Sequence, residues 1–508
     1  MSDANSDTLY AKNPATGETL GQVPVASARD VEAAVTRARH AQAEWARVPV
    51  KQRAQQLLGF GEQLVRFAED LVDLLVLETG KPRLEALIHE VFVLCDLIGW
   101  QCKNAPRALA GRDEPLHLLK HRKSRVSYVP RGIVGIISPW NYPLMLPFSD
   151  VAQATLAGNA VVLKPSEHAP LIALKAKHLW DASGMPKELL QVVTGGAATG
   201  SALLDAGIDK LAFTGGVESG RKVAEQCAKN LIECVLELGG KAPLIVCEDA
   251  DLERAARAII WGGFSNAGQA CVSVERVLCH EVVYDELTRR SVELCNELRQ
   301  GSVSDGEVEV GPVVLGHKLD HLDELVQDAL AKGAKLGCGG ARLQRRGNFY
   351  APTLLLDCTP SMRVMREEIF GPIVPLMAVK DDAEAIRVAN DSPLGLTSYV
   401  FSQDTEHAAT LAAQLRAGST VINDVHSDIA SPEVPFGGVK HSGYGRIHGI
   451  EGLRGMCHVK HVSVNRTALP KRSPFWFPYH QADFARVLAG MRLLFSGSGP
   501  LGRLSRWL

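Results

Sequence analysis

The sequence predicts an α/β fold built from two domains, and two observations lead to this prediction. From about residue 132 onwards, short apolar runs rich in Val, Ile and Leu alternate with helical patterns, which is typical of a parallel sheet covered by helices on both faces. The chain also has 508 residues, more than the roughly 250–300 at which a single hydrophobic core stops growing. We therefore expect a doubly wound domain followed by a second α/β domain.

The first domain begins with two helical patterns and continues with five strand patterns. Apolar residues recur at spacings of three and four over residues 28–46 and 51–76, which predicts amphipathic helices packed by one face. The strand patterns cover residues 132–140, 159–167, 189–196, 210–216 and 234–240, with helical patterns at 170–182 and 217–231 between them. We expect residues 1–112 and 131–239 to form this doubly wound domain.

The second domain, expected over residues 240–441, repeats the alternation of strands and helices. Its strand patterns cover 241–247, 276–283, 348–356, 374–379, 397–402 and 419–424, and its helical patterns cover 251–261, 284–299, 317–332 and 405–416. Two α/β units of similar size predict a cleft between them.

Two extended segments, 113–130 and 455–466, lie outside both domains and alternate polar with apolar residues. Exposed extended arms usually pair with another strand, often in a second subunit. We therefore expect a β-arm for oligomerisation, in a homodimer or a homotetramer.

The C-terminal extension, residues 467–508, is rich in aromatic and basic residues, with Asp483 as its single acid. Apolar residues recur at helical spacing between Phe484 and Phe495. A helix docked on its own or a neighbouring subunit is the first interpretation. The alternative is a helix on a membrane surface, which would make the protein membrane-peripheral.

The net charge and the cysteine pattern restrict the kind of ligand that the protein binds and the cellular compartment in which it works. The 55 Lys and Arg residues nearly balance 57 Asp and Glu residues, so the chain has no general positive field for nucleic acid, and we expect a small-molecule ligand. The 11 cysteines include no Cys-x-x-Cys pair, and several stand in apolar runs. This pattern predicts reduced thiols and a cytoplasmic location, with neither a disulfide framework nor a metal site. Neither a targeting signal nor an apolar run of the roughly 20 residues needed to span a bilayer is visible.

Three side chains beside predicted strands or helices could carry catalysis. Cys271 stands among small and polar residues, which suits an accessible thiolate, although inert packing is the commoner use of a free cysteine. Glu237 ends an apolar strand, where burial would raise its pKa toward that of a general base; a capping or salt-bridged carboxylate is the alternative. Asn141 lies between two prolines, where a rigid amide either stabilises an oxyanion or only forms a turn.

Two segments are candidates for holding a nucleotide, although neither is a Gly-x-Gly-x-x-Gly fingerprint. In FTGGVESG (213–220), Gly215 and Gly216 allow a close backbone approach to a diphosphate at the start of a helix. In LKPSE (163–167), Lys164 and Glu167 follow a buried strand, and Glu167 could hold a ribose diol. An ordinary strand-to-helix loop and a surface ion pair are the simpler interpretations.

These segments together resemble the NAD(P)-dependent aldehyde dehydrogenase superfamily, of the hydrolytic, non-acylating type, from about residue 8 to residue 466. Seven motifs match in order: PWNYP (139–143), GNAVVLKPSE (158–167), FTGGVESG (213–220), LELGGK (236–241), FSNAGQAC (264–271), EEIFGP (367–372) and PFGGVKHSGYGR (435–446). The resemblance implies that the first domain binds NAD and that the second is the catalytic domain.

The resemblance also implies the reaction, which is the oxidation of an aldehyde to a carboxylic acid. Cys271 would attack the aldehyde, Asn141 and the Cys271 N–H would hold the oxyanion, and Glu237 would activate the water that hydrolyses the thioester. The residues implied to contact the cofactor are Trp140, Lys164, Glu167, Gly215, Gly216, Glu368 and Phe370. Because Glu167 would repel a 2′-phosphate, we expect NAD in preference to NADP.

Two alternative functions are a CoA-acylating dehydrogenase and a catalytically inactive binding relative. The presence of Glu237 disfavours the first, and the presence of all three catalytic residues disfavours the second.

The implied tunnel positions are mainly apolar and lack an Arg, which predicts an uncharged aldehyde; they are Tyr142, Leu146, Ser149, Ala270, Val272, Ala430 and Phe436. Asp150, where Lys is frequent in the family, and Ile447, where an acidic residue is common, depart from the family pattern.

Overall fold

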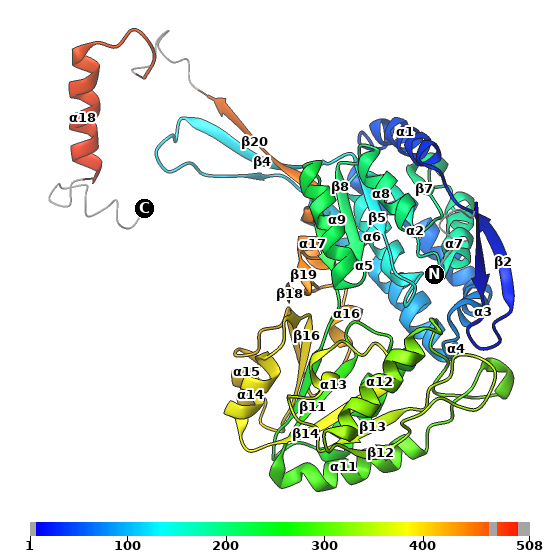
Figure 1. Cartoon of the computed structure of the whole chain (residues 1–508). Helices are drawn as coiled ribbons and strands as arrows, with labels where there is room; N and C mark the ends of the chain where they lie inside the picture. Colours follow the sequence, from blue (N-terminus) through cyan, green and yellow to red (C-terminus); the bar gives the residue numbers. More distant parts are fainter. Residues whose placement is uncertain (1–6, 467–474, 496–508) are drawn as a thin grey trace. The chain divides into compact units, whose positions relative to one another are not determined.

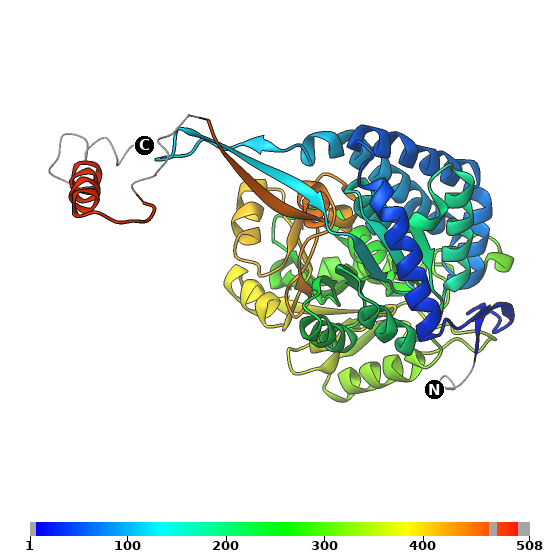
Figure 2. The same cartoon turned by 90° about the horizontal axis from the view of Figure 1, so that it is seen from above.

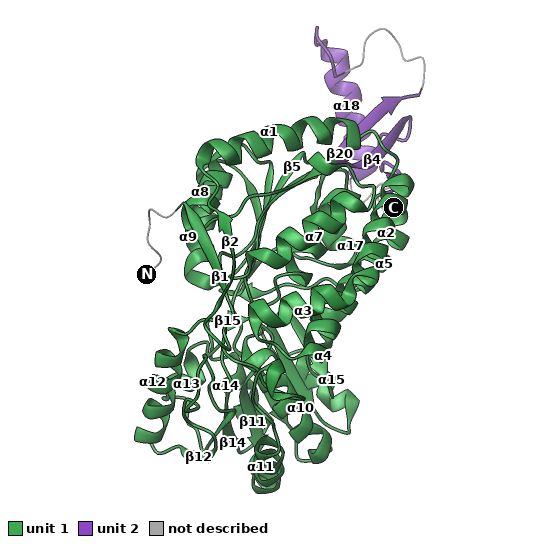
Figure 3. Ribbon diagram, turned by 90° about the vertical axis from the view of Figure 1, so that its right-hand side faces the viewer, with its two compact units in different colours: residues 1–109, 130–458 green, residues 110–129, 459–508 purple. Residues whose placement is uncertain are grey.

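The computed structural model describes residues 7–466 and 475–495, and it has the expected α/β class. The chain divides into two compact units (Figure 3). The first unit contains the described residues up to Leu109 together with Pro130–His458, and the second contains Ala110–Val129 and the described residues from Val459 onwards. Both parallel sheets, several of whose strands are labelled in Figure 1, belong to the first unit.

The first unit begins with a hairpin and a group of helices. The hairpin is β1 (Thr8–Lys12) with β2 (Thr19–Pro24). The helices are α1 (Ala28–Trp45), α2 (Val50–Arg66), α3 (Ala68–Thr79), α4 (Arg83–Glu85), the π-helix η1 (Ala86–Phe92) and α5 (Val93–Ala108). The helix expected over 51–76 is therefore two helices, because the backbone leaves the helical region at Phe67 (φ −109°, ψ 26°).

The first sheet has the strand order β19-β9-β8-β5-β6-β7. Its strands are β5 (Ile133–Ile137), β6 (Ala160–Lys164), β7 (Leu190–Val192), β8 (Lys210–Thr214), β9 (Glu233–Glu237) and the edge strand β19 (Gly443–Tyr444). The strands β5 to β9 are parallel, and β19 pairs antiparallel with β9. Because β5 pairs with both β6 and β8, the strand order reverses beside β5, and ligands bind at the carboxyl ends of strands at such a switch point.

The helices between these strands are α6 (Met145–Leu156), α7 (Pro170–Ala182), η2 (Lys187–Leu189), α8 (Ala197–Asp205) and α9 (Val217–Lys229). Helix α1 packs against β6 and α8, and α6 packs against β5, β6 and α5. Helix α6 is absent from the sequence-based expectations. Every residue of it is buried, so it lacks the polar face that makes a helical pattern visible.

The second sheet has the order β12-β13-β14-β11-β10-β16-β17. Its strands are β10 (Ala242–Val246), β11 (Val274–His280), β12 (Lys335–Cys338), β13 (Thr353–Leu356), β14 (Ile373–Val379), β16 (Thr397–Phe401) and β17 (Ser419–Ile422). All neighbours are parallel except β12 and β13, which are antiparallel. The second α/β layer is thus present, as expected.

The helical elements that follow the strands of this sheet are α10 (Leu252–Phe264), η3 (Ser265–Gly268), α11 (Glu281–Asn296), η4 (Val303–Asp305), α12 (Lys318–Ala331), α13 (Arg363–Arg366), α14 (Asp382–Asn390), α15 (Thr405–Ala412) and α16 (Ser427–Ala430). Helix α17 (Gly449–Gly455) packs against α5 and α6. A two-stranded sheet joins β15 (Leu394–Gly395) to β18 (Val439–Lys440). The strand expected over 276–283 ends at His280, which is the N-cap of α11, so the apolar residues that follow are helical.

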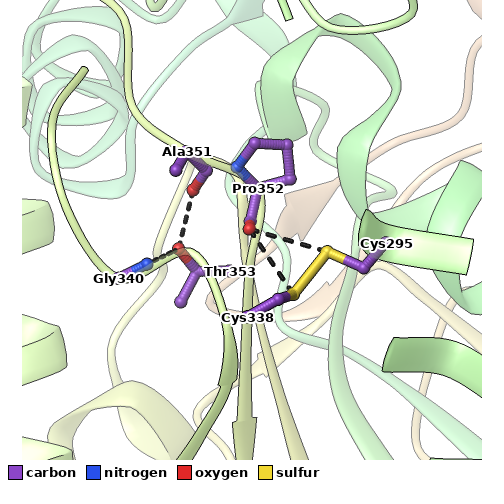
Figure 4. The surroundings of a disulfide bond; sticks show 6 residues. All are labelled: Cys295, Cys338, Gly340, Ala351, Pro352 and Thr353. Atoms are coloured by element: carbon purple, nitrogen blue, oxygen red, sulfur yellow. Dashed lines mark hydrogen bonds between the residues drawn. A yellow bond between two sulfur atoms is a disulfide. The ribbon is translucent and has the colours of Figure 1, made fainter. Parts of the chain in front are cut away.

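One pair of cysteines departs from the expectation of reduced thiols. Cys295 of α11 and Cys338 of β12 form a disulfide bond (Figure 4), so the expectation is wrong for these two residues. They are 43 residues apart in the sequence and meet because α11 packs against β12. The spacing of cysteines along a chain contains no information about such a tertiary contact.

The second unit contains the predicted arm and the C-terminal helix. β3 (Arg112–Asp113), β4 (Arg122–Pro130) and β20 (Cys457–Asn465) form a sheet in which β4 lies between the other two, and Figure 2 shows β4 and β20 side by side. The predicted apolar helix is present as α18 (Gln481–Phe495), with Phe484, Met491 and Phe495 exposed. Within the described ranges, no helix is long and apolar enough to cross a membrane.

Candidate active site

Residues that the sequence singled out follow three neighbouring strands at the switch point of the first sheet. Trp140 and Asn141 come after β5, Gly215 and Gly216 come after β8, and Glu237 is the last residue of β9. Cys271 enters from the second sheet, in the turn between η3 and β11. The topology therefore brings these predicted residues to the region where the two sheets approach each other.

The turn before Cys271 has an uncommon backbone. Asn266 (φ 51°) and Ala267 (φ 53°) both adopt left-handed conformations, which side chains other than glycine seldom take. Gly240 lies against this turn, and a side-chain carbon placed there would collide with the main-chain oxygen of Cys271. The second glycine of LELGGK is therefore required by the close approach of the two segments.

In the protein without substrate or cofactor, the Cys271 thiol is protonated at neutral pH. Burial and the nearby carboxylates of Glu237, Glu368 and Asp428 raise the pKa of Cys271 to about 12. A nucleophilic thiolate at this position consequently requires a base that removes its proton.

Asn141 is tied to the segment that carries Cys271. Its Nδ2 donates to the main-chain oxygen of Gln269 at 3.0 Å, and its own main-chain oxygen accepts from Asn266 Nδ2 at 3.0 Å. The Asn141 side chain is buried, and its Oδ1 has no hydrogen-bond partner among the described residues. Because an amide nitrogen has two hydrogens, one N–H of Asn141 is left for a ligand oxygen.

A buried ion pair that sequence reasoning missed supports Asn141. Lys81 Nζ lies 2.6 Å from Glu90 Oε1, and both side chains are fully buried. Lys81 Nζ also donates to the main-chain oxygen of Asn141 at 2.8 Å, while Glu90 Oε2 accepts from the N–H groups of Leu144 and Met145. The pair thus holds Asn141 and the start of α6 together. In the sequence, its signal is a carboxylate within the mainly apolar run ALIHEVFVLC (86–95).

Glu237 is a buried carboxylate without a hydrogen-bond partner for either oxygen among the described residues. Burial raises the pKa of Glu237 well above its usual value, the charge of Asp150 raises it further, and Arg446 opposes the shift. Burial also raises the pKa of Asp150, on α6, to about 7. Two buried carboxylates near each other resist simultaneous ionisation, so the charge of Asp150 raises the affinity of Glu237 for a proton.

A pocket of about 280 Å³ opens next to Cys271. Its lining includes Tyr142, Leu146, Val272 and Ala430, which belong to the predicted tunnel positions; Ser149, Ala270 and Phe436 are not in contact with it. The other lining residues are Ile88, His89, Val93, Met145, Trp261, Asp424, Val425, His426, Ser427 and Ile429.

The charge of this pocket restricts the ligands that it accepts. The described residues that line it include neither Lys nor Arg, and Asp424 is acidic. Burial lowers the pKa of His89 and that of His426 to about 4, so both imidazoles are neutral at pH 7. A ligand carboxylate would find no counter-ion there.

Four of the predicted nucleotide residues, Lys164, Glu167, Gly215 and Gly216, lie at or just after the ends of β6 and β8 in the first sheet. Lys164 Nζ donates to the main-chain oxygen of Gly195 at 2.9 Å and lies 3.4 Å from Glu167 Oε2. The Glu167 side chain is 36% exposed, so its carboxylate remains accessible to a ligand. Gly216 is the N-cap of α9, and no side chain caps that helix, which suits a diphosphate at its amino end.

Glu368 and Phe370 lie between α13 and β14, and Phe370 contacts Trp140. Glu368 Oε1 accepts from the Gly240 N–H at 3.0 Å, and burial raises the pKa of Glu368. The rings of Phe370 and Trp140 meet edge to face, with centroids 5.5 Å apart. Glu275, which sequence reasoning missed, positions this loop by accepting from the N–H of Phe370 at 3.0 Å. The seven predicted residues therefore offer the donors, carboxylates and open backbone that a dinucleotide needs.

Comparisons with known proteins bear on the same site. A sequence model described as the aldehyde dehydrogenase family matches residues 1–462. The chain is 38% identical over 498 residues to a 4,4'-diapolycopene aldehyde oxidase of Methylomonas sp, covering 98% of this chain and 93% of that protein. It is 36% identical to an NADP-dependent succinate-semialdehyde dehydrogenase of Escherichia coli (strain K12), covering 91% of this chain and 95% of that one.

The solved structures agree with the sequence comparisons. An NAD-dependent aldehyde dehydrogenase from Sinorhizobium meliloti matches with a TM-score of 0.89 and 34% identity, covering 94% of each chain. An Escherichia coli NADP-dependent enzyme matches with a TM-score of 0.87 and 35% identity, covering 91% of this chain and 95% of that one.

Proposed function

Because the chain belongs to the aldehyde dehydrogenase family, we propose that it oxidises an uncharged, apolar aldehyde to the carboxylic acid with NAD. The observation that carries this proposal is the meeting of a thiol, an amide and an unpartnered buried carboxylate beside a pocket that no described Lys or Arg lines. Cys271, Asn141 and Glu237 are the three residues to which we assign the chemistry.

The first step is the attack of Cys271 on the aldehyde carbon. The thiol proton of Cys271 passes to water in the adjoining pocket, so that Glu237 remains available for the hydrolytic step. The resulting thiolate bonds to the carbonyl carbon, and the oxygen becomes an oxyanion. The free N–H of Asn141 and the Cys271 N–H stabilise that oxyanion.

The second step converts the tetrahedral adduct on Cys271 into a thioester by loss of hydride. Bound NAD supplies the hydride acceptor. The chain contributes position: Glu368 and Phe370 from one side and Trp140 from the other are suited to hold the nicotinamide end near Cys271.

The third step is hydrolysis of the thioester. Glu237 takes a proton from a water molecule, the hydroxide attacks the acyl carbon, and the Cys271 thiolate leaves. Neither oxygen of Glu237 is committed to a protein partner among the described residues, which leaves the carboxylate free to bind that water.

The substrate class follows from the charge of the pocket. The names of the relatives divide between 4,4'-diapolycopene aldehyde and succinate semialdehyde, and only the second contains a carboxylate. A pocket with neutral His89 and His426, acidic Asp424 and no cation among its described lining favours the uncharged aldehyde. The names of the relatives include both NAD and NADP, so they leave the cofactor open. We assign a preference for NAD to Glu167, because its carboxylate would repel the 2′-phosphate of NADP.

The exposed arm and the extension support a homodimer or homotetramer. Val459, Val462 and Val464 of β20 are exposed on a strand at the edge of its sheet, and such edges commonly pair with a partner. The diapolycopene-aldehyde relative aligns with 98% of this chain, so its match reaches into residues 467–508.

The test uses rapid-mixing kinetics with an apolar aldehyde and NAD. Cys271→Ala should produce no NADH, while NAD binding by calorimetry remains. Glu237→Gln should slow turnover by about 10²–10⁴-fold, with thioester accumulation on Cys271 detected by mass spectrometry. Formation of an acyl-CoA product by the unaltered enzyme in the presence of CoA, or higher efficiency with succinate semialdehyde than with an apolar aldehyde, would contradict the proposal.

A further inference from the structure

A second pair of thiols lies outside the site described above. Cys227 is near the end of α9 and Cys234 is in β9, on either side of the turn that joins these two elements. Helix α9 packs against β9, and the two side chains share a hydrogen bond. Figure 1 labels α9 and β19, which flank this part of the sheet.

The surroundings of this pair are open to small reagents. A pocket of about 480 Å³ is lined by both cysteines together with Lys210 and Tyr444. Cys227 is buried, whereas Cys234 is partly exposed. A small oxidant in the pocket can therefore reach Cys234 first.

The contacts of Cys234 favour its thiolate. Its Sγ lies 3.1 Å from the Tyr444 hydroxyl, which can donate to a thiolate, and Cys227 is its other hydrogen-bond partner. The hydrogen bond from Cys227, and then that from Tyr444 and the charge of Lys210, lower the pKa of Cys234, while the same contact raises the pKa of Cys227. The catalytic Cys271, whose pKa is raised, has the opposite environment.

We propose that Cys234 and Cys227 form a dithiol that hydrogen peroxide oxidises to a disulfide. The Cys234 thiolate attacks one peroxide oxygen, the O–O bond breaks, and the products are a sulfenic acid and hydroxide. The Cys227 sulfur then attacks Cys234, the S–O bond breaks, and the proton of Cys227 leaves with the oxygen as water. Peroxide is reduced by two electrons and the two sulfurs are oxidised by two.

The disulfide would connect two elements that serve the active site. Helix α9 begins after Gly216, a residue predicted to lie by the diphosphate, and β9 ends at Glu237. The two thiols interact and line the same pocket, so the Cys227 sulfur is close to the Cys234 sulfenic acid.

Alkylation of the full-length, reduced protein measures the reactivity of each thiol. Iodoacetamide is applied at pH 7 for graded times, and the labelled cysteines are quantified by peptide mass spectrometry. Cys234 should react at least about tenfold faster than Cys95, a matched, partly exposed thiol whose pKa burial raises to about 11. Equal rates at Cys234 and Cys95 would overturn the proposal.

Peroxide treatment tests the second step. After exposure to hydrogen peroxide, digestion without reductant should yield a peptide pair joined through Cys227 and Cys234, lighter by two hydrogen atoms. In Cys227→Ser the reaction should stop at the Cys234 sulfenic acid, which dimedone traps, and circular dichroism checks that this variant is folded. Cys234→Ser should form neither product. The proposal fails if the unaltered protein forms no Cys227–Cys234 link, or if Cys234 in Cys227→Ser is not trapped.

Discussion

Replacing Glu90 by Gln should destabilise the protein and slow aldehyde oxidation, because Glu90 is the counter-ion of a fully buried lysine. Lys81 Nζ lies 2.6 Å from Glu90 Oε1, and neither side chain is exposed. In Glu90→Gln the described groups left to the ammonium would be the Asn141 main-chain oxygen at 2.8 Å, the face of Tyr142, whose ring centroid is 4.4 Å away, and the more distant carboxyl of Glu85. None of these replaces an ionised carboxylate in direct contact with the cation.

The size of the effect follows from the burial of the pair. Removal of one partner of a buried ion pair costs about 3–5 kcal/mol, because the remaining charge has no compensation. Lys81→Met should cost less than Glu90→Gln, since Glu90 would still accept from the N–H groups of Leu144 and Met145 at the amino end of α6. In the double variant no charge is left unpaired, so its cost should fall well below the sum of the two.

The assay is a double-mutant cycle measured by guanidinium unfolding, with steady-state aldehyde oxidation in parallel. The free-energy losses of the single variants should not add, and the double variant should recover stability relative to Glu90→Gln. Activity should fall in Glu90→Gln, because the ionised link that ties Lys81, and through it Asn141, to the start of α6 is lost. Additive losses in the cycle, or a Glu90→Gln variant as stable as the unaltered protein, would refute this account of the pair.

Three further predictions concern charge and the extension. Asp150→Asn removes a negative charge that raises the pKa of Glu237, so the acid limb of the rate–pH profile should move to lower pH; a stationary limb would contradict the coupling. Glu167→Gln should reduce the preference for NAD over NADP by about tenfold, measured as the ratio of kcat/KM values, because repulsion of the 2′-phosphate is lost. Truncation after Arg466 should weaken subunit assembly in sedimentation velocity while aldehyde oxidation continues, since it removes the exposed apolar residues of α18; pelleting of the intact chain with anionic liposomes, lost on truncation, would favour the membrane interpretation instead.

The sequence predicted the elements whose pattern reflects their environment. Helix α7 has the predicted bounds of 170–182, and the strand patterns of both sheets appear as strands, because half-buried helices and buried parallel strands differ in period and length. A helix that is buried on every side lacks the alternation of apolar and polar faces that predicts a helix. Helix α6 is buried in this way, so its sequence has no amphipathic pattern. The boundary at His280 was also hidden, because apolar residues continue from β11 into α11.

In the candidate site, too, some features are determined by the sequence and others by the tertiary structure. The sequence by itself determined the residue types and their order, because a thiol, a carboxylate and an amide in short motifs made Cys271, Glu237 and Asn141 recognisable. Partners far apart in the chain were decided by tertiary structure alone: Lys81 with Asn141, Glu275 with Phe370, and Cys295 with Cys338. The pKa of Glu237 belongs to this second group, since burial and the charge of Asp150 exist only after α6 packs near β9. Short motifs record local chemistry, whereas desolvation and long-range pairing arise from packing, which no local window of sequence contains.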